Sequence, residues 1–214
     1  MAVRLPPHAP GLRIGLYGGS FNPPHAGHRH VSRLGLTRLW LDRLWWLVTP
    51  CNPLKDCSGL PPTAQRLAAA RALARHPRIA VTAFEEEIGA AYTVDSLSYL
   101  SARCPGVRFV WIMGADCLAG FHRWRGWETI AGLMPLAVID RPGWTLRATQ
   151  SRAALKLARY RIDESDAPLL ADQEPPAWVY LHGPRSSLSS TALRAQRMHL
   201  DMENIENRDP SALS

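Results

Sequence analysis

Short apolar segments alternate with longer segments compatible with helices, and this alternation limits the fold more than any other feature of the sequence. Such apolar segments are typical of strands in a parallel sheet that helices cover on both faces. We therefore expect an α/β fold with a doubly wound, mainly parallel sheet in the order 3-2-1-4-5 and a further C-terminal strand. The predicted strands are Leu12–Tyr17, Leu44–Val48, Arg78–Thr82, Val107–Ile112, Leu136–Ile139 and Trp178–Leu181.

Helical segments are predicted between these strands. Thr63–Arg75 is the clearest, because Pro62 precedes an alanine- and leucine-rich stretch that His76 and Pro77 close. We expect one domain over residues 12–200, with loose termini at 1–11 and 201–214. The other predicted helices are His28–Trp40, Val94–Ala102, Trp127–Leu133, Arg147–Arg159 and a last helix from about Ser190 to Met198.

Composition excludes several classes of protein. No window approaches the roughly 20 uncharged apolar residues that a membrane span needs, and the N-terminal sequence MAVRLPPHAPG has no apolar core of a secretory signal. The four cysteines, Cys51, Cys57, Cys104 and Cys117, form no CxxC pair. We therefore expect reduced thiols in a cytoplasmic protein, with neither a disulfide framework nor a zinc site.

The chain is basic, with a formal net charge of +7. A positive balance favours anionic partners such as nucleic acid, a membrane surface or phosphate-bearing small molecules. All basic residues except Lys55 and Lys156 are arginines, and they are scattered along the chain without forming a run. Biased coding is the more favoured explanation of such scatter, so charge alone predicts no nucleic-acid surface.

The segment from Gly18 to His28, GGSFNPPHAGH, carries the strongest chemical signal. Two glycines at the carboxyl end of a strand allow the backbone to approach a ligand closely. His25 and His28 lie where a loop meets a predicted helix, whose free N–H groups favour an anion. The same pattern also fits a Gly/Pro-rich turn with two incidental histidines, and it is neither a GxGxxG motif nor a P-loop.

A second candidate segment follows the fourth predicted strand, at Gly114 and Asp116. Strands 1 and 4 are neighbours at the switch point of the expected sheet, so both segments open onto the crevice where nucleotides bind. Asp116 either binds a ribose hydroxyl or caps the following helix. Trp124, among other aromatic residues, either stacks on a flat ring or packs in the core.

A third candidate site lies near the C-terminus. Ser189, Ser190 and Thr191 fit a helix N-terminus that presents hydroxyl and N–H groups to an anion, and Arg194 follows one turn later. A serine-rich helix cap is the alternative explanation. Lys55, in a proline-bounded loop, is either a phosphate-binding charge or an ordinary surface lysine.

Taken together, these motifs resemble the HxGH nucleotidylyltransferases and, within them, the bacterial nicotinate-nucleotide adenylyltransferases. The resemblance spans about residues 12–198. Two details depart from that family's usual pattern: Asn52-Pro53-Leu54-Lys55 replaces Pro-Pro-His-Lys, and Ser20 and Asn22 stand where Thr and Asp are common. The matching segments are Gly18–His28, Pro50–Lys55, Tyr92–Leu97, Met113–Asp116, Phe121–Trp124, Arg141–Gly143 and Leu188–Arg194.

The resemblance implies transfer of an adenylyl group from ATP to nicotinate mononucleotide, with Mg²⁺ carried by ATP. It implies catalytic roles for His25, His28 and Arg194, with His28 contacting the transition state, and mononucleotide binding by Thr93 and Trp124. Other acceptors, such as nicotinamide mononucleotide or phosphopantetheine, and a nucleic-acid-binding α/β module are the alternatives. No nucleic-acid or membrane partner is expected. The implied ATP-binding residues are Gly18, Gly19, Ser20, Phe21, Lys55, Gly114, Asp116, Ser189, Ser190 and Thr191.

Overall fold

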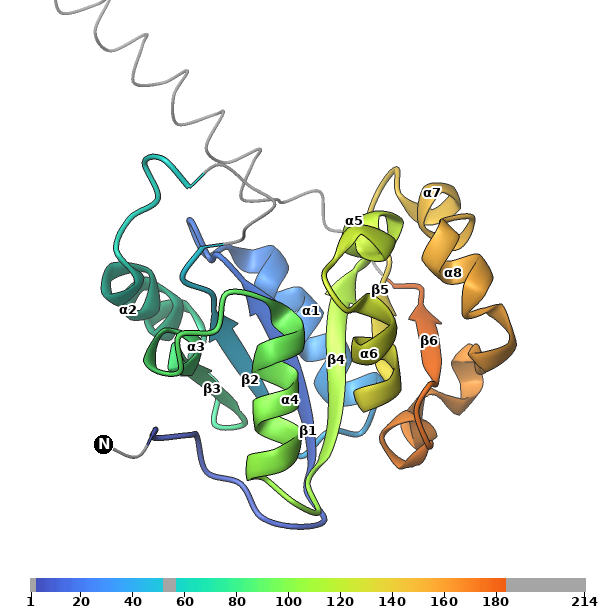
Figure 1. The fold of residues 1–214 in the computed structure, drawn as a ribbon, viewed down its shortest axis with the longest axis horizontal. Coiled ribbons are helices and arrows are strands. Elements are labelled where there is room, and N and C mark those ends of the chain that lie inside the picture. Colours follow the sequence, from blue (N-terminus) through green and yellow to red (C-terminus); the bar gives the residue numbers. More distant parts are fainter. Residues whose placement is uncertain (1–2, 52–56, 184–214) are drawn as a thin grey trace, which may run out of the picture.

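The computed structural model describes residues 3–51 and 57–183, and a six-stranded sheet forms its centre (Figure 1). All neighbouring strands run parallel, in the order β3-β2-β1-β4-β5-β6. This confirms the expected 3-2-1-4-5 order and the further strand at the edge. The strands are β1 (Arg13–Gly19), β2 (Arg43–Val48), β3 (Ile79–Thr82), β4 (Arg108–Gly114), β5 (Leu136–Ile139) and β6 (Trp178–Leu181).

Helices cover both faces of this sheet. Helix α1 lies behind the sheet in Figure 1, and helices α4 and α6 lie in front of it. In the part of the chain that the structure describes, no helix has the length and apolar character needed to cross a membrane. The helices are α1 (Ala26–Arg38), α2 (Thr63–Leu73), α3 (Phe84–Glu87), α4 (Thr93–Arg103), α5 (Ala115–Gly120), α6 (Trp127–Leu133), α7 (Thr145–Thr149) and α8 (Arg152–Lys156), with 3-10 turns η1 (Phe121–Arg123), η2 (Ala158–Tyr160) and η3 (Glu164–Asp172).

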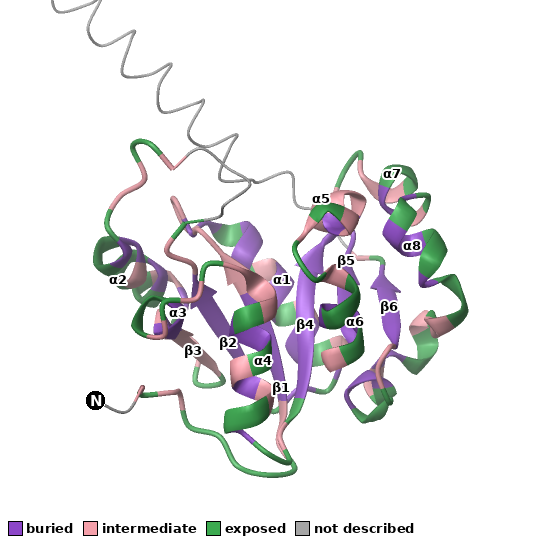
Figure 2. Cartoon of the chain, in the orientation of Figure 1, coloured by how far each residue is buried: buried purple, intermediate pink, exposed green. Residues whose placement is uncertain are grey.

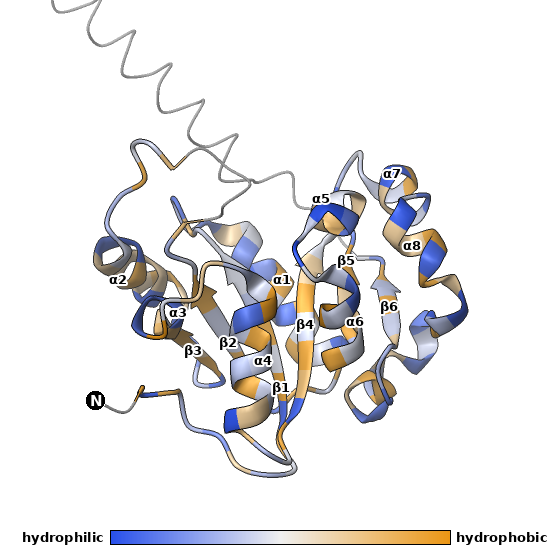
Figure 3. Ribbon diagram, in the orientation of Figure 1, coloured by the Kyte–Doolittle hydropathy of each residue, from blue (hydrophilic) through white to orange (hydrophobic). Residues whose placement is uncertain are grey.

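Alternation of side chains along each strand divides the core into two layers. In β4, Phe109, Trp111 and Met113 belong to the layer that includes α4, α5 and α6, whereas Val110 and Ile112 belong to the layer with α1 and α2. The strands are buried along most of their length (Figure 2) and are rich in apolar residues (Figure 3). Burial of both faces explains why the strands read as continuous apolar runs.

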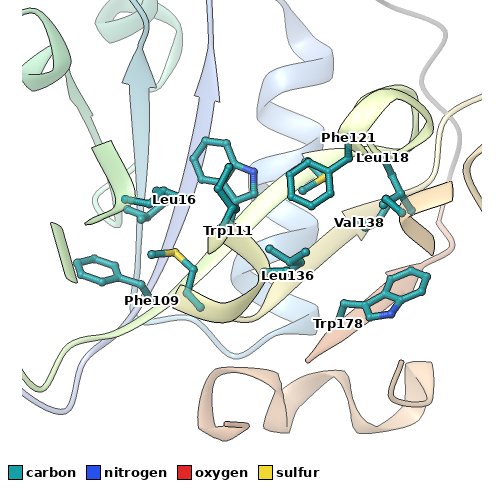
Figure 4. Packing of buried hydrophobic residues seen from close by; sticks show 14 of the residues in the cluster. Leu16, Phe109, Trp111, Leu118, Phe121, Leu136, Val138 and Trp178 are labelled. Carbon is teal, nitrogen blue, oxygen red and sulfur yellow. The ribbon is translucent and has the colours of Figure 1, made fainter. Parts of the chain in front are cut away.

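The front layer of the core, which includes α4, α5 and α6, contains several large aromatic side chains. Figure 4 shows Trp111 of β4 between Leu16 of β1 and Phe121 of η1. Gly18 makes room for this indole, because a Cβ atom at Gly18 would lie 2.6 Å from the Cη2 atom of Trp111. The glycine at the end of β1 therefore has a packing role beside any role toward a ligand.

The prediction of one helix over Arg147–Arg159 is wrong. The segment forms α7, α8 and the 3-10 turn η2, and the break between α7 and α8 falls at Ser151. The Ser151 hydroxyl accepts a hydrogen bond from the N–H of Ala154 at 3.2 Å, so this side chain caps α8. Serine favours such caps over helix interiors because its hydroxyl competes for backbone groups. The last predicted helix, Ser190–Met198, lies outside the described residues.

The N-terminal segment, which the sequence predicts as a loose arm, contacts the body of the protein. Val3 and Leu5 pack against the front layer of the core. The N–H of Gly11 donates to the carbonyl oxygen of Gly106 at 2.8 Å. Residues 3–11 therefore lie at the end of the sheet where β1 and β4 begin (Figure 1). The glycine motifs lie at the other end, where these two strands finish.

The expectation of four reduced thiols is corrected at one pair. Cys51 and Cys57 form a disulfide, with a Cα–Cα distance of 6.1 Å, whereas Cys104 and Cys117 remain thiols. The loop after β2 brings the two cysteines within bridging range. A search for CxxC spacing misses such a pair, because the residues are six apart in sequence.

Candidate active site

A cavity of about 270 Å³ opens beside the carboxyl ends of β1 and β2 and reaches Trp111 of β4, so it borders the switch point between β1 and β4. It is lined by residues from segments that are far apart in the sequence, which the parallel sheet brings together. The predicted site residues among them are Gly18, Gly19, Ser20, Thr93 and Trp124. The other lining residues are Thr49, Pro50, Cys51, Glu85, Ala90, Ala91, Tyr92, Trp111, Cys117, Arg123 and Arg125.

His25 and His28 form a capping pair at the N-terminus of α1. The His25 Nδ1 atom accepts from the N–H of Gly27, and the His28 Nδ1 atom accepts from the N–H of His25, both at 3.1 Å. A neutral imidazole whose Nδ1 accepts carries its proton on Nε2. Each ring therefore keeps an Nε2–H group as a donor, and the ring centroids lie 3.9 Å apart.

Both histidines are buried. His25 is 6% and His28 7% exposed. The His28 ring lies 4.7 Å from Phe21, measured between centroids. The hydroxyl of Ser32 donates to the His28 carbonyl oxygen at 2.8 Å and accepts from the indole N–H of Trp46 at 2.7 Å. These contacts fix the orientation of the pair.

Burial keeps both imidazoles neutral near pH 7. Desolvation, with a smaller contribution from the Arg141 charge, lowers the pKa of His25 to about 4. Desolvation also lowers the pKa of His28 to about 3, assisted by His25 and Arg141. A neutral Nε2–H donor binds a phosphate oxygen without needing a proton from solvent.

These pKa values predict a specific loss of stability in acid. Between the unfolded pKa of 6.5 and the folded values, the unfolded chain binds more protons than the folded one. The free energy of unfolding should therefore fall as the pH falls through this window. His28→Asn removes one titrating group, so its melting temperature should fall less than that of the wild type between about pH 7 and pH 5. Parallel melting curves for the two proteins across this range would contradict the assignment.

The loop that follows β1 turns sharply at Phe21. Phe21 has φ 46°, in the left-handed region that is rare for residues with a side chain. Its ring is 1% exposed and stacks on Trp46 at a centroid distance of 4.9 Å. Phe21 therefore supports the loop from within the core and does not line the cavity, whereas Gly18, Gly19 and Ser20 do.

Asp116 lies in an ion pair instead of capping a helix. The N-cap residue of α5 is Gly114, and no side chain in the described part of the chain caps that helix. An Asp116 oxygen lies 3.3 Å from Nε of Arg141. A Cβ atom at Gly114 would come within 2.3 Å of the Asp116 carboxylate and 2.7 Å of Arg141, so glycine is required for this close approach.

Thr93 and Trp124 come from different elements and meet at the cavity. Thr93 is the first residue of α4, and no side chain of the described residues caps the N-terminus of this helix. Trp124 follows η1 and packs edge-to-face on Phe121 and Trp111, at centroid distances of 5.5 Å and 6.5 Å. Both residues are half-buried, so each presents part of its surface to a ligand.

Sequence reasoning missed two buried polar residues of this region, Glu85 and Arg66. Glu85 lines the cavity and is 4% exposed; its Oε1 atom accepts from the Ser96 hydroxyl at 2.7 Å. Its Oε2 atom has no hydrogen-bond partner among the described residues. Burial raises the pKa of this carboxyl above its usual range, despite the Ser96 bond. Arg66, in α2, is 2% exposed. Three consecutive glutamates and an arginine in a helix give no sequence signal of burial.

Several predicted residues lie outside the described part of the chain: Lys55, Ser189, Ser190, Thr191 and Arg194. The altered Asn52–Lys55 segment lies there as well. Within residues 3–51 and 57–183, no group of three or more His, Cys, Asp or Glu side chains is arranged to hold a metal ion.

Comparisons with known proteins agree with this geometry. A family model described as cytidylyltransferase-like matches residues 16–196. A relative from Methylorubrum extorquens, named "Probable nicotinate-nucleotide adenylyltransferase", is 64% identical over 185 residues, which cover 86% of this chain and 100% of the relative. A relative of the same name from Mesorhizobium japonicum is 57% identical over 189 residues, covering 88% of this chain and 97% of the relative.

The fold also matches a solved structure, Plasmodium falciparum nicotinic acid mononucleotide adenylyltransferase complexed with NaAD. The TM-score is 0.65, over 86% of this chain and 83% of that one. At 20% identity this likeness establishes the fold alone. The sequence matches go further, since they combine high identity with nearly complete coverage. The chain therefore belongs to the cytidylyltransferase-like family and, within it, to the nicotinate-nucleotide adenylyltransferases.

Proposed function

We propose that this protein transfers the adenylyl group of ATP to nicotinate mononucleotide, giving nicotinate adenine dinucleotide and pyrophosphate, a step of NAD biosynthesis. The observation that carries the proposal is the pair of Nε2–H donors on His25 and His28. His25 is the N-cap of α1 and His28 lies in its first turn. This helix follows β1, whose carboxyl end lines the cavity together with Thr93 and Trp124. The names of the relatives agree with this activity.

In the proposed reaction, a phosphate oxygen of the mononucleotide attacks the α-phosphorus of ATP. The bond from the α-phosphorus to the bridging oxygen breaks, and pyrophosphate leaves with that electron pair. Such transfers depend mainly on alignment and on stabilisation of charge. His25 and His28 would donate their Nε2–H groups to the α-phosphate at the start of α1. Lys55, Ser189, Ser190, Thr191 and Arg194 are proposed to hold the departing pyrophosphate.

The N-terminus of α4 is proposed to hold the carboxylate of the nicotinate ring. The first N–H groups of a helix have no partner within it, and Tyr92 supplies no cap for α4. The Thr93 hydroxyl adds a donor at the same end of the helix. Trp124, half-buried in the cavity wall, would stack on the pyridine ring. The carboxylate of Asp116 is proposed to accept a hydrogen bond from a ribose hydroxyl.

We propose that Mg²⁺ enters with ATP. Asp116, the carboxylate that follows β4, is already paired with Arg141, and the described donors do not form a cage around a cation. Mg²⁺ commonly keeps several waters and takes the rest of its ligands from substrate phosphates. Bound in this way it would neutralise charge on the phosphates, while the chain positions the reacting atoms.

Pyrophosphate release tests the proposed function directly. The purified protein is incubated with ATP, Mg²⁺ and nicotinate mononucleotide, and pyrophosphate is measured by a coupled assay. We expect release that requires the mononucleotide and yields an equal amount of nicotinate adenine dinucleotide. Release of pyrophosphate without the acceptor, or none with it, would contradict the proposal.

The acceptor site should prefer the acid to the amide. Nicotinamide mononucleotide lacks the carboxylate, so the donors of Thr93 and the start of α4 would be left unpaired. We expect kcat/KM to favour nicotinate mononucleotide by at least about tenfold, which corresponds to roughly 1.4 kcal/mol. The measurement compares kcat/KM for both mononucleotides at saturating ATP. Equal values would mean that α4 does not bind the ring carboxylate.

A further inference from the structure

Arg66 is buried behind the cavity and bonds to the segments that form its wall. Its Nε atom donates to the carbonyl oxygen of Pro61 at 2.9 Å. One Nη1 hydrogen goes to the Ser20 carbonyl at 2.8 Å and the other to the Thr49 carbonyl at 2.7 Å. Nη2 donates to the Pro50 carbonyl at 2.9 Å and to the Thr63 hydroxyl at 3.0 Å.

These bonds use every donor that the side chain has. A guanidinium carries five N–H groups in a rigid planar fork, and Arg66 meets five acceptors. Four of the acceptors are backbone carbonyls, so these bonds depend on the path of the backbone and not on the identity of other side chains. Because the guanidinium group is rigid and planar, these bonds hold the five acceptors close to its plane.

Three of the five acceptors belong to two walls of the same cavity. Ser20 ends the glycine segment after β1, and Thr49 and Pro50 follow β2; all three line the cavity. The two strands are already joined by the N–H of Thr49, which donates to the Gly19 carbonyl at 3.0 Å. Beyond this last bond both segments leave the sheet, and the side chain of Arg66 bridges them there.

We propose that Arg66 is a positioning residue for adenylyl transfer, holding the Gly18–Ser20 segment at a fixed distance from the Thr49–Cys51 segment. The proposal rests on the function proposed above, in which Gly18–Ser20 contact ATP. Displacement of a substrate-binding segment by about 1 Å can cost a hundredfold in rate, because the reacting atoms are no longer aligned. Arg66 acts through the backbone of these segments and is not assigned a contact with substrate.

The test compares four proteins: the wild type, Arg66→Lys, Thr63→Val and Arg71→Lys. Lysine keeps the charge but has three donors on one atom, so it cannot serve carbonyls on both walls. Thr63→Val removes one acceptor and leaves the arginine in place. Arg71 is exposed on the same helix and controls for the Arg-to-Lys change. For each protein we would measure kcat, both KM values, ATP affinity by calorimetry, and the melting temperature.

We expect kcat of Arg66→Lys to fall by about tenfold or more at saturating substrates, measured well below its melting temperature. ATP affinity should also weaken by several-fold. Thr63→Val should show a smaller loss of kcat in the same direction, and Arg71→Lys should match the wild type. Loss of melting temperature alone, with kcat and ATP affinity unchanged in the folded protein, would overturn the proposal.

Two results would change which measurement tests the role of Arg66. If Arg66→Lys fails to fold, the Thr63→Val protein provides the test. An unchanged kcat and ATP affinity in that protein would overturn the proposal, and a reduced kcat would support it. If the wild type releases no pyrophosphate with ATP and nicotinate mononucleotide, the proposed function fails. ATP affinity then still tests Arg66, because weaker binding in Arg66→Lys but not in Arg71→Lys supports its role in placing Gly18–Ser20, and equal binding overturns it.

Discussion

Replacing His28 with Asn is expected to lower kcat by about 100- to 1000-fold in a protein that still folds. The Asn side-chain oxygen can take the place of Nδ1 and accept the N–H of His25, which His28 now does at 3.1 Å. The Nε2–H donor is lost, however. Removing one donor that faces developing charge costs on the order of 2.7–4 kcal/mol of transition-state stabilisation. The measurement is kcat for pyrophosphate release at saturating substrates.

Two further changes at His28 separate catalysis from stability. His28→Gln can place an amide N–H near the position of Nε2, so it should retain more activity than His28→Asn. His28→Ala removes the cap as well as the donor; loss of such a cap costs about 1 kcal/mol. It should therefore melt below His28→Asn. Near-normal kcat in a folded His28→Asn protein would show that the transition-state contact lies elsewhere.

Replacing Trp124 with Ala is expected to raise the KM for the mononucleotide by about five- to 150-fold, with a much smaller change for ATP. Stacking of a base on an aromatic side chain contributes about 1–3 kcal/mol. Trp124 is half-buried in the cavity wall and is proposed to bind the mononucleotide, whereas the histidine pair at the start of α1 is proposed to bind ATP. The KM values for the two substrates should therefore change to different extents. The measurement is a pair of KM titrations on the same preparation.

Trp127→Ala is the matched control for this variant. Trp127 is also half-buried and packs edge-to-face on Phe121, at 5.7 Å between centroids, but it does not line the cavity. Its loss should lower the melting temperature without changing the ratio of the two KM values. If Trp124 has only a packing role, Trp124→Ala should cost about 3–5 kcal/mol of stability. It would then keep the wild-type KM ratio, and the ring-stacking residue would have to be sought elsewhere.

The architecture could be predicted from the sequence because its signals are local. The strands Leu136–Ile139 and Trp178–Leu181 were predicted with the bounds that the structure has. Their order follows from the rules that govern parallel sheets. The expectation that the β1 glycine segment, Thr93 and Trp124 share a site came from the recognised motifs. In the structure these residues line one cavity.

Other parts of the site could not be predicted because they depend on contacts between distant segments. The role of Arg66 is set by carbonyls of Ser20 and Thr49, which carry no side-chain signal. The burial of Glu85 depends on the packing of α3 on the sheet, and the sequence shows only an acidic run. The burial of His28 could not be predicted either, because its packing against Phe21 depends on the left-handed turn at Phe21.

In the proposed function, the buried, neutral state of His25 and His28 would couple nucleotide binding to the uptake of protons. A polyphosphate beside two imidazoles would raise their proton affinity, since an opposite charge favours the protonated form. By reciprocity, protonation must then strengthen the binding of the nucleotide. Acid would thus lower the stability of the protein without nucleotide, whose histidines have pKa values of about 4 and about 3. It would at the same time favour the nucleotide-bound protein. In mildly acidic solution the substrate itself would become a larger share of what keeps this protein folded.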